Sequence, residues 1–448
     1  MSVLEKALQM LDAHALCDNC LGRQFALLGY NMENSDRGKA VKLSLLLQAS
    51  ADAQSKDPEG LKRLKVLAAN GFSREAADTL RHLKKRVPKQ AEQCFLCDGK
   101  FQLVDGLVRK ALAEIADYEF TSFLVGIELP VHVEEREDEF KALFNVSHGE
   151  SIRHEFGRLV GKAVEAQSGK TVDYRTPDLV IIANPFTEGI KLQVNPLFIA
   201  GRYRKLVRDL PQSRWFCSSC RGRGCAKCGG TGLLYPESVE ALVSQPLLEA
   251  AEGEKTAFHA SGREDIDARM LGTGRPFVVE VSKPRKRFLD LPKLKEVINA
   301  GAKDKVEVST LRFTVKDVVR RLKKAESAQK EYRVQVEFED EVAEEGLGMV
   351  VEQLSGAVIK QQTPLRVLHR RADLTREKYI YWVKVKKVSP KKAEMQIRCQ
   401  GGLYVKELVS GDEGRTVPSV SMLLGNRAKP LKLDVLKVIM DDVGEVKK

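Results

Sequence analysis

The stretch "FHASGREDIDARMLGTGRPFVVEVSKPRKR", residues 258–287, places charges of both signs in a turn that leads into an apolar strand. Within it, Asp265 and Asp267 stand among Arg263, Arg269 and Arg275 in a turn bracketed by glycines, and a basic cluster follows. Because a turn needs only one or two polar residues, the surplus indicates that an acid does chemistry while basic residues hold a polyanion. On its own the motif is weak, since most Asp–Arg neighbours in turns are solvated ion pairs.

The chain on either side of this stretch alternates between strand and helix patterns. In "YRVQVEF" the residues Tyr332, Val334, Val336 and Phe338 share one face, which is typical of a half-buried strand. Strands with intervening helices from residue 240 onward predict a mixed or antiparallel sheet with helices on one face. The predicted fold class is therefore α+β.

Composition divides the chain into four segments. Helical spacing in "AVKLSLLLQAS" and "REAADTLRHLKKRV" predicts a mostly helical region at 1–105. Interleaved strand and helix signals predict a small α+β domain at 106–210, and a cysteine- and glycine-rich loop follows at 211–235. The longer α+β unit spans 240–448. A chain of 448 residues is expected to hold about three domains of roughly 150 residues.

The charge balance favours a nucleic-acid partner. The formal net charge is +12 and the isoelectric point is near 9.1, which suits phosphate contacts and counterion release. No apolar run approaches the ~18 residues of a membrane span, and the N-terminus lacks the apolar core of a signal peptide. We therefore expect a soluble, cytoplasmic protein that has no membrane partner.

Eight of the nine cysteines form C-x-x-C pairs, the arrangement that supplies tetrahedral zinc ligands. The pairs are Cys17–Cys20, Cys94–Cys97, Cys217–Cys220 and Cys225–Cys228. The first two would close one site across the helical region, and the last two a second, compact site. Four thiolates leave no position for a substrate, so structural zinc is favoured over redox or disulfide use. The second loop is short, and an unmetallated form stays an alternative; Cys399 is predicted as a buried core thiol.

Three further stretches stand with "GREDIDARMLG" in one order: "KEYRVQV", "TPLRVLHRRADL" and "GGLYVKELVSGDEGR". Together the four resemble the catalytic domain of pseudouridine synthases, and more narrowly the archaeal and eukaryotic tRNA pseudouridine synthases of the T-loop. "TPDLVIIANPFTEGIKLQVNPLFIAGRYRKL" resembles the THUMP-type RNA-binding module of that family, and the cysteine pairs resemble its zinc site. The resemblance covers most of the chain.

The resemblance implies roles for individual residues. Asp265, preferred to Asp267 from the G-R-x-D spacing, is the catalytic aspartate; Tyr332 stacks on the target uracil; and Lys406 pairs with the aspartate. Lys406 is a point charge where many relatives have a planar arginine fork. The substrate-binding residues are Arg263, Arg366, His369, Arg370, Arg371, Tyr404, Val405 and either Leu431 or Leu433, with Leu433 preferred.

The implied reaction suits these side chains. Isomerisation of uridine breaks the N-glycosidic bond and joins C5 of the uracil to the sugar, so it requires no catalytic cofactor. A carboxylate can act as nucleophile or base if a nearby cation keeps it ionised. The base must leave its stack, and an aromatic face can receive it. The expected partner is the T-arm of tRNA, modified at positions 54 and 55 by a monomeric enzyme.

Plainer interpretations of the same residues stay open. Tyr332 shares an apolar face with Val334 and suits an ordinary core tyrosine, and Lys406 suits a solvated helix. A non-catalytic, zinc-containing RNA-binding protein would carry the same basic patches and cysteines. A chaperone-like zinc module is favoured only by "CSSCRGRGCAKCGGTG", residues 217–232, which occurs once.

Overall fold

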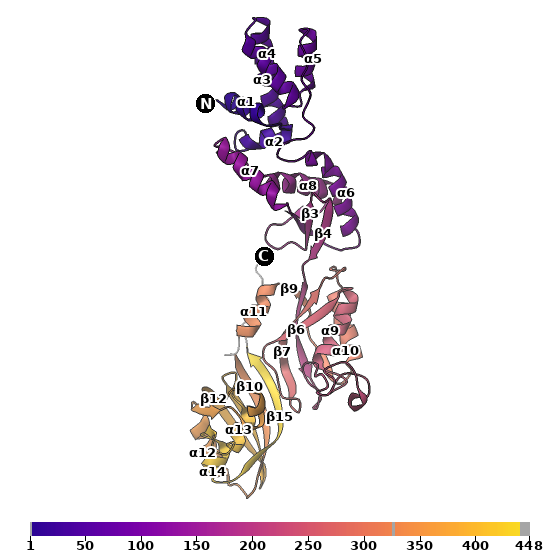
Figure 1. Cartoon of the computed structure of the whole chain (residues 1–448). Coiled ribbons are helices and arrows are strands. Elements are labelled where there is room, and N and C mark those ends of the chain that lie inside the picture. Colours follow the sequence, from indigo (N-terminus) through magenta and orange to yellow (C-terminus); the bar gives the residue numbers. More distant parts are fainter. Residues whose placement is uncertain (1, 325–327, 440–448) are drawn as a thin grey trace. The chain divides into compact units, whose positions relative to one another are not determined.

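The computed structural model describes residues 2–324 and 328–439. The side chains of Lys324 and Arg370 are not among the described parts. The chain divides into two compact units, residues 1–195 and 196–448 (Figure 1). No helix within the described ranges is both long and apolar enough to cross a membrane.

The first unit begins with helices, as the spacing of apolar residues predicts. Ser2 and Glu5 form a capping box at the start of α1, and Ser73 caps α5. The helices are α1 Val3–Ala13, α2 Asp18–Gly22, α3 Asn34–Gln54, α4 Pro58–Ala69, α5 Arg74–His82 and α6 Val104–Ile115, with short 3₁₀ turns at η1 Arg23–Phe25 and η2 Lys100–Leu103.

A four-stranded sheet follows in the same unit, in the order β2-β1-β3-β4. Strand β1 runs parallel to β2 and β3, and β3 and β4 form an antiparallel hairpin. The strands are β1 Ser122–Ile127, β2 Thr171–Val172, β3 Leu179–Asn184 and β4 Gly189–Val194, and the helices are α7 Val131–Leu143 and α8 Ile152–Ser168. Helix α8 ends at Gly169, whose φ of 67° suits glycine.

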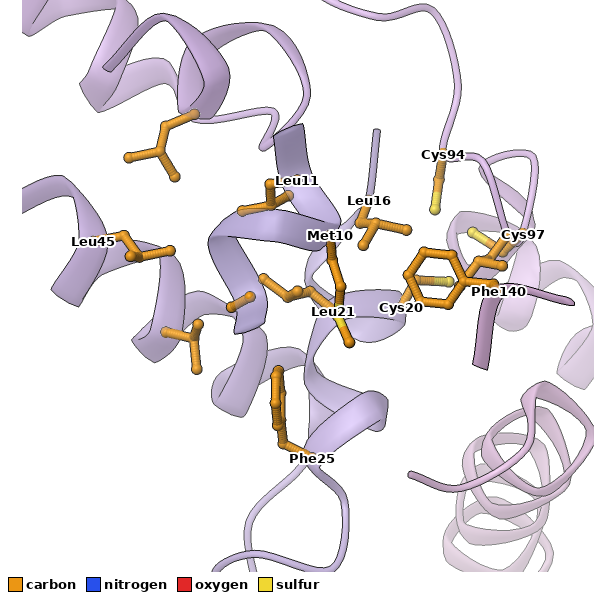
Figure 2. Packing of buried hydrophobic residues seen from close by; sticks show 14 of the residues in the cluster. Met10, Leu11, Leu16, Cys20, Leu21, Phe25, Leu45, Cys94, Cys97 and Phe140 are labelled. Carbon is orange, nitrogen blue, oxygen red and sulfur yellow. The ribbon is translucent and has the colours of Figure 1, made fainter. Parts of the chain in front are cut away.

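One hydrophobic core joins the helices to the sheet region. Met10, Leu21 and Leu45 of the helices share it with Phe140 of α7, and the buried sulfurs of Cys94 and Cys97 lie at its edge (Figure 2). Because the segment predicted at 1–105 and residues 106–195 of the next predicted segment share this core, they form one compact unit.

The second unit is built on an eleven-stranded mixed sheet, ordered β14-β11-β12-β13-β10-β15-β7-β5-β8, with β6 paired to β7 and β9 to β5. Most pairs are antiparallel, whereas β15 and β7 run parallel. The strands are β5 Leu197–Lys205, β6 Lys255–Ala260, β7 Arg269–Ser282, β8 Val306–Val308, β9 Arg312–Thr314, β10 Gln329–Phe338, β11 Val358–Gln362, β12 Thr375–Ser389, β13 Lys392–Cys399, β14 Thr416–Val417 and β15 Ala428–Ile439.

Helices cover both faces of this sheet, which corrects the prediction of helices on one face. Ile199 of β5 packs in a core with α9 and α10, whereas its neighbours Phe198 and Ala200 pack with Val318 of α11. Consecutive apolar residues on β5 bury both of its faces. The helices are α9 Val239–Ala250, α10 Leu291–Gly301, α11 Lys316–Lys324, α12 Glu344–Leu354, α13 Val405–Ser410 and α14 Val420–Leu424, with 3₁₀ turns η3 Ala226–Cys228 and η5 Leu365–Arg370.

The structure also corrects one domain boundary. Strand β5 was expected to close the small α+β domain, which was predicted to end at residue 210. Instead β5 hydrogen-bonds along its length to β7, with Ile199 opposite Val279, and so belongs to the second unit. The boundary lies at 195/196, because strand pairing with β7 outweighs nearness in sequence to β4.

Candidate active-site cleft and cysteine clusters

A cleft of about 1210 Å³ opens in the second unit where several distant segments meet. The β6–β7 turn supplies Arg263 and Asp265, and β10 supplies Tyr332. Segment η5 contributes Arg366, and the start of α13 contributes Lys406. The polar turn at 261–268 therefore faces residues from three other parts of the chain.

Asp265 lies between two cations. Its Oδ2 is 3.1 Å from Nη2 of Arg366 and 3.5 Å from Nζ of Lys406, and Nη1 of Arg366 donates to Oδ1 at 3.4 Å. The carboxylate keeps about a third of its surface exposed to the cleft. Both cations are close enough to attract the negative charge of this carboxylate.

Asp265 forms the expected ion pair with Lys406, and it has a second cation partner, Arg366, that was not expected. Lys406 was expected to pair with this carboxylate, yet its Nζ lies closer to Asp267, at 2.7 and 2.8 Å from the two oxygens. Arg366, predicted only to bind substrate, presents two guanidinium nitrogens to Asp265. The fold thus brings Arg366, which lies 40 positions before Lys406 in the chain, to Asp265, where it supplies the planar fork that Lys406 lacks.

The charges around Asp265 shift the pKa values of its neighbours Asp267 and Arg366. Burial acts to raise the pKa of Asp267, but the hydrogen bond and charge of Lys406 bring it below its ordinary value. Burial acts to lower the pKa of Arg366, but Glu407, whose Oε1 accepts from Nε at 2.6 Å, and Asp265 raise it. Arg366 is therefore a fixed cation, anchored at one end by Glu407.

We expect Arg366→Met to lower the rate of the reaction by about 10- to 150-fold, since a hydrogen bond to a charged group contributes about 1.5–3 kcal/mol. The loss should fall on kcat if the fork positions Asp265, because the substrate would still bind. Arg366→Lys should restore only part of the rate, as it returns the charge without the fork. Single-turnover kinetics measure both variants, and an unchanged kcat would exclude this role.

The apolar side of the cleft is formed by β10, α13 and β15. Tyr332 is half-buried and lines the cleft, and burial raises the pKa of its hydroxyl, so the ring is neutral. Val405 and Leu433 are more than nine-tenths buried and also line it. Leu431, the alternative to Leu433, is 40% exposed and lies elsewhere. Tyr404 lines the cleft and lies 5.9 Å from the Arg366 guanidinium.

Of the remaining predicted substrate-binding residues, some line the cleft and others do not. Arg263 and Arg371 line the cleft and are exposed. His369 is exposed on η5 but is not among the cleft-lining residues, so the structure does not bring it to the site. The side chain of Arg370 lies outside the described part of the chain.

A buried polar platform lies beneath the turn, and sequence analysis missed it. Glu264 accepts from Nε of Arg275 at 2.8 Å and from the hydroxyl of Tyr203 at 3.0 Å. Nζ of Lys205 donates to the main-chain oxygens of Asp265 and Ile266, at 3.2 and 3.0 Å. These groups fix the backbone that carries the carboxylate. In β5, Tyr203 and Lys205 alternate with Arg202 and Arg204, and this alternation was the available signal, but the partner strand was unknown.

Asp434 of β15 gathers three arginines at the edge of the same region. It accepts from Arg208 at 2.6 Å, from Arg269 at 2.9 Å and from Arg333 at 3.1 Å. Burial acts to raise the pKa of Asp434, but these hydrogen bonds and charges lower it to about 2. The carboxylate ties β15 to β7 and β10.

We expect Asp434→Asn to destabilise the second unit by about 2 kcal/mol at neutral pH, from a shift of nearly two pKa units at 1.36 kcal/mol each. That corresponds to a melting temperature lower by about 4–8 °C. Because the folded pKa is depressed, this stabilisation is present above the unfolded pKa near ~4 and is lost as pH falls toward 2. Denaturant unfolding from pH 7 to 3 should show the two proteins converging; a constant difference would contradict the ion-pair explanation.

The two cysteine clusters have the geometry of four-sulfur metal sites. In each, the four sulfurs lie within 4.8 Å of one another. Sγ of Cys17 is 3.6 Å from Sγ of Cys97, and Sγ of Cys217 is 3.9 Å from Sγ of Cys225. A tetrahedron with zinc–sulfur bonds of about 2.3 Å has edges of about 3.8 Å. The donor sets therefore fit zinc.

Glycines in the second cluster let its loop close on itself. Gly224 has φ of 86°, and a Cβ built there would lie 2.5 Å from the main-chain oxygen of Gly230. Sγ of Cys228 accepts main-chain hydrogen bonds from Cys225 and Gly232, each at 3.2 Å. Such donors stabilise a thiolate. Cys399, in contrast, is fully buried on β13 among Met395 and Ile397, as predicted for a core thiol.

Comparison with known families agrees with this geometry. Residues 198–439, more than half of the chain, match the family model "Pus10, C-terminal". The chain belongs to the Pus10 family. Residues 107–184 match a second model, "Pus10 THUMP domain, archaeal", so the Pus10 THUMP match ends before β5, in agreement with the corrected boundary. The predicted family resemblance is confirmed.

Relatives in the Pus10 family match nearly the whole chain. The "tRNA pseudouridine synthase Pus10" of Methanothrix thermoacetophila is 42% identical over 438 residues, covering 97% of this chain and 94% of the relative. The protein of the same name from Methanocaldococcus jannaschii is 44% identical over 439 residues, covering 96% and 93%. A crystal structure of a Cbf5-Nop10-Gar1 complex is similar in part, at 15% identity over 53% of this chain and 48% of that one, with a TM-score of 0.30.

Proposed function

We propose that this chain isomerises uridine to pseudouridine in tRNA, with T-loop positions 54 and 55 as its targets. The observation that carries the proposal is Asp265, which lies in a cleft between Arg366 and Lys406, with Tyr332 on the same wall. Membership of the Pus10 family and the names of its relatives support the same activity. A monomeric state and a cytoplasmic location stay predictions from the sequence.

The proposed chemistry starts from an ionised Asp265. The target uridine leaves its stack, and its base enters the cleft against the ring of Tyr332, with Val405 and Leu433 as apolar walls. The carboxylate acts as nucleophile or base while the bond between C1′ and N1 breaks. The uracil turns, C5 bonds to C1′, and the proton that C5 loses is balanced by the one that N1 gains. No oxidant, reductant or energy source enters this balance.

Arg366 and Lys406 have the role of holding that carboxylate in place and offsetting its negative charge in a site partly closed from water. A neighbouring cation lowers the cost of an unprotonated carboxylate. The exposed Arg263 and Arg371 on the cleft wall suit phosphate contacts, which position RNA without reading its sequence.

We also propose that both cysteine clusters hold zinc in a structural role. With four sulfur ligands, neither site would keep an open position for a substrate, so zinc would stabilise the fold and take no part in the reaction. Zinc bound at Cys17, Cys20, Cys94 and Cys97 would tie the first helices to the segment that precedes α6.

The experiment is to incubate the purified protein with an unmodified tRNA transcript and to map pseudouridine by a chemical probe. Signal at positions 54 and 55 supports the proposal, and transcripts with cytidine at either position test each site separately. A transcript that is bound in a salt-dependent way but shows no pseudouridine would instead support the non-catalytic RNA-binding protein.

A further inference from the structure

Lys330 of β10 is a buried cation that lines the active-site cleft. Only 9% of its surface is exposed. Within residues 2–324 and 328–439, its ammonium group has no hydrogen bond or ion pair. Burial, and then the charge of Arg275, lower the pKa of Lys330 to about 8, so the group is still mostly charged at neutral pH. An unpaired buried charge is costly unless a ligand pairs with it.

A second lysine lies close by on β12. Lys378 also lines the cleft and has no ion-pair partner in the described ranges. Its charge acts to lower the pKa of Lys330, and both ammonium groups act on the pKa of the buried Cys399 thiol. The two cations therefore lie within electrostatic reach of one another, on neighbouring parts of the cleft wall.

Each ammonium group lies against a glycine turn. A Cβ built on Gly262 would lie 3.2 Å from Nζ of Lys330, and one built on Gly402 would lie 3.1 Å from Nζ of Lys378. Both glycines have positive φ, at 73° and 92°, which other residues rarely adopt. The glycines leave room for the two cations beside the main chain.

The two cations next to Asp265, Arg366 and Lys406, are already paired. Arg366 contacts Asp265 and Glu407, and Lys406 contacts both aspartates. Among the residues that the structure describes, neither Lys330 nor Lys378 forms an ion pair with a carboxylate, so they attract an anionic ligand more strongly than the paired cations do. A phosphodiester is always ionised and offers several acceptor oxygens, whereas a uracil carbonyl is neutral and compensates a charge less.

We propose that Lys330 and Lys378 form a phosphate subsite that holds a phosphodiester flanking the flipped uridine. The inference rests on the proposed function, because it needs an RNA substrate in this cleft. Anchoring that phosphate would fix the ribose beside Asp265 and would leave the uracil free to turn during the reaction.

The test removes the charge of the phosphate in the tRNA or the charges of the two lysines in the protein. A tRNA assembled by ligation carries one neutral methylphosphonate in place of the phosphate 5′ or 3′ of the target uridine. With the unaltered protein, one of the two replacements should lower kcat/KM for pseudouridine formation by about 10- to 100-fold. With Lys330→Met/Lys378→Met, kcat/KM on the normal tRNA should be reduced by a similar factor, and the methylphosphonate should cause little further loss.

Three variants keep the test free of folding artefacts. Lys386→Met, at an exposed position on the same strand as Lys378, should retain both full activity and full sensitivity to the methylphosphonate. Lys330→Arg should retain much of the activity, because it keeps the charge. Lys378→Met alone, at a half-buried position, should reproduce part of the effect.

If each methylphosphonate lowered kcat/KM of the double variant by the same factor as that of the unaltered protein, the losses from the variant and from the methylphosphonate would multiply. That result at both phosphate positions would overturn the subsite. Absence of pseudouridine in the normal tRNA with the unaltered protein would instead overturn the proposed function, and the subsite with it. The reaction of the unaltered protein with normal tRNA, which contains no methylphosphonate, distinguishes these two failures.

Discussion

Asp265→Asn is expected to abolish pseudouridine formation, with a loss of at least about 10³-fold in the single-turnover rate. The amide has nearly the shape of the carboxylate but has neither its charge nor its nucleophilic or basic oxygen. Binding of tRNA should persist, because the arginines and lysines of the cleft remain. The measurement pairs pseudouridine mapping with a binding titration at fixed salt.

Asp267→Asn is the matched control for this experiment. Asp267 stands two residues away, is more exposed, and shares Lys406 with Asp265. Without the Asp267 charge, Lys406 is free to turn fully to Asp265, so we expect less than about a tenfold loss. If Asp267→Asn were the inactive variant and Asp265→Asn the active one, the catalytic role would pass to Asp267. Full activity in both variants would end the proposed mechanism.

Removal of zinc from the first cluster is expected to unfold residues 1–195. Structural zinc sites contribute about 10–16 kcal/mol of binding free energy, which equals or exceeds the ~5–15 kcal/mol stability of an ordinary domain. Cys20, Cys94 and Cys97 are buried at the edge of the single core that the helices share with the sheet region (Figure 2). Cys20→Ser or a strong chelator should therefore abolish the cooperative melting transition of this unit.

The second cluster provides the comparison for that prediction. Cys225 and Cys228 are half-buried in a loop whose sulfurs join none of the large cores among the described residues. We expect Cys225→Ser to remove one of two zinc ions per chain, measured by elemental analysis, and to leave the main thermal transitions within a few degrees. A protein that contains no zinc, or one whose melting is unchanged by chelation, would contradict the structural role.

Sequence patterns were sufficient for much of the secondary structure. The alternation in "YRVQVEF" became β10, with Val334, Val336 and Phe338 buried, and "AVKLSLLLQAS" became part of α3, with Leu45 and Leu46 buried. Both patterns report which face of an element is apolar, and that property is local. Patterns could not assign β5 to the second unit, since strand pairing depends on residues 80 positions away.

The sequence by itself determined the family, the cysteine spacing and the residue types of the active site, because these are properties of short motifs in a fixed order. Only the tertiary structure decided that Arg366 presents its fork to Asp265 and that Lys406 lies closer to Asp267. It also decided that Lys330 is buried with no ion-pair partner in the part of the chain that the structure describes. Charge pairing acts over a few ångströms in space. Segments 40 to 140 residues apart in the chain come within that reach only when the sheet has formed.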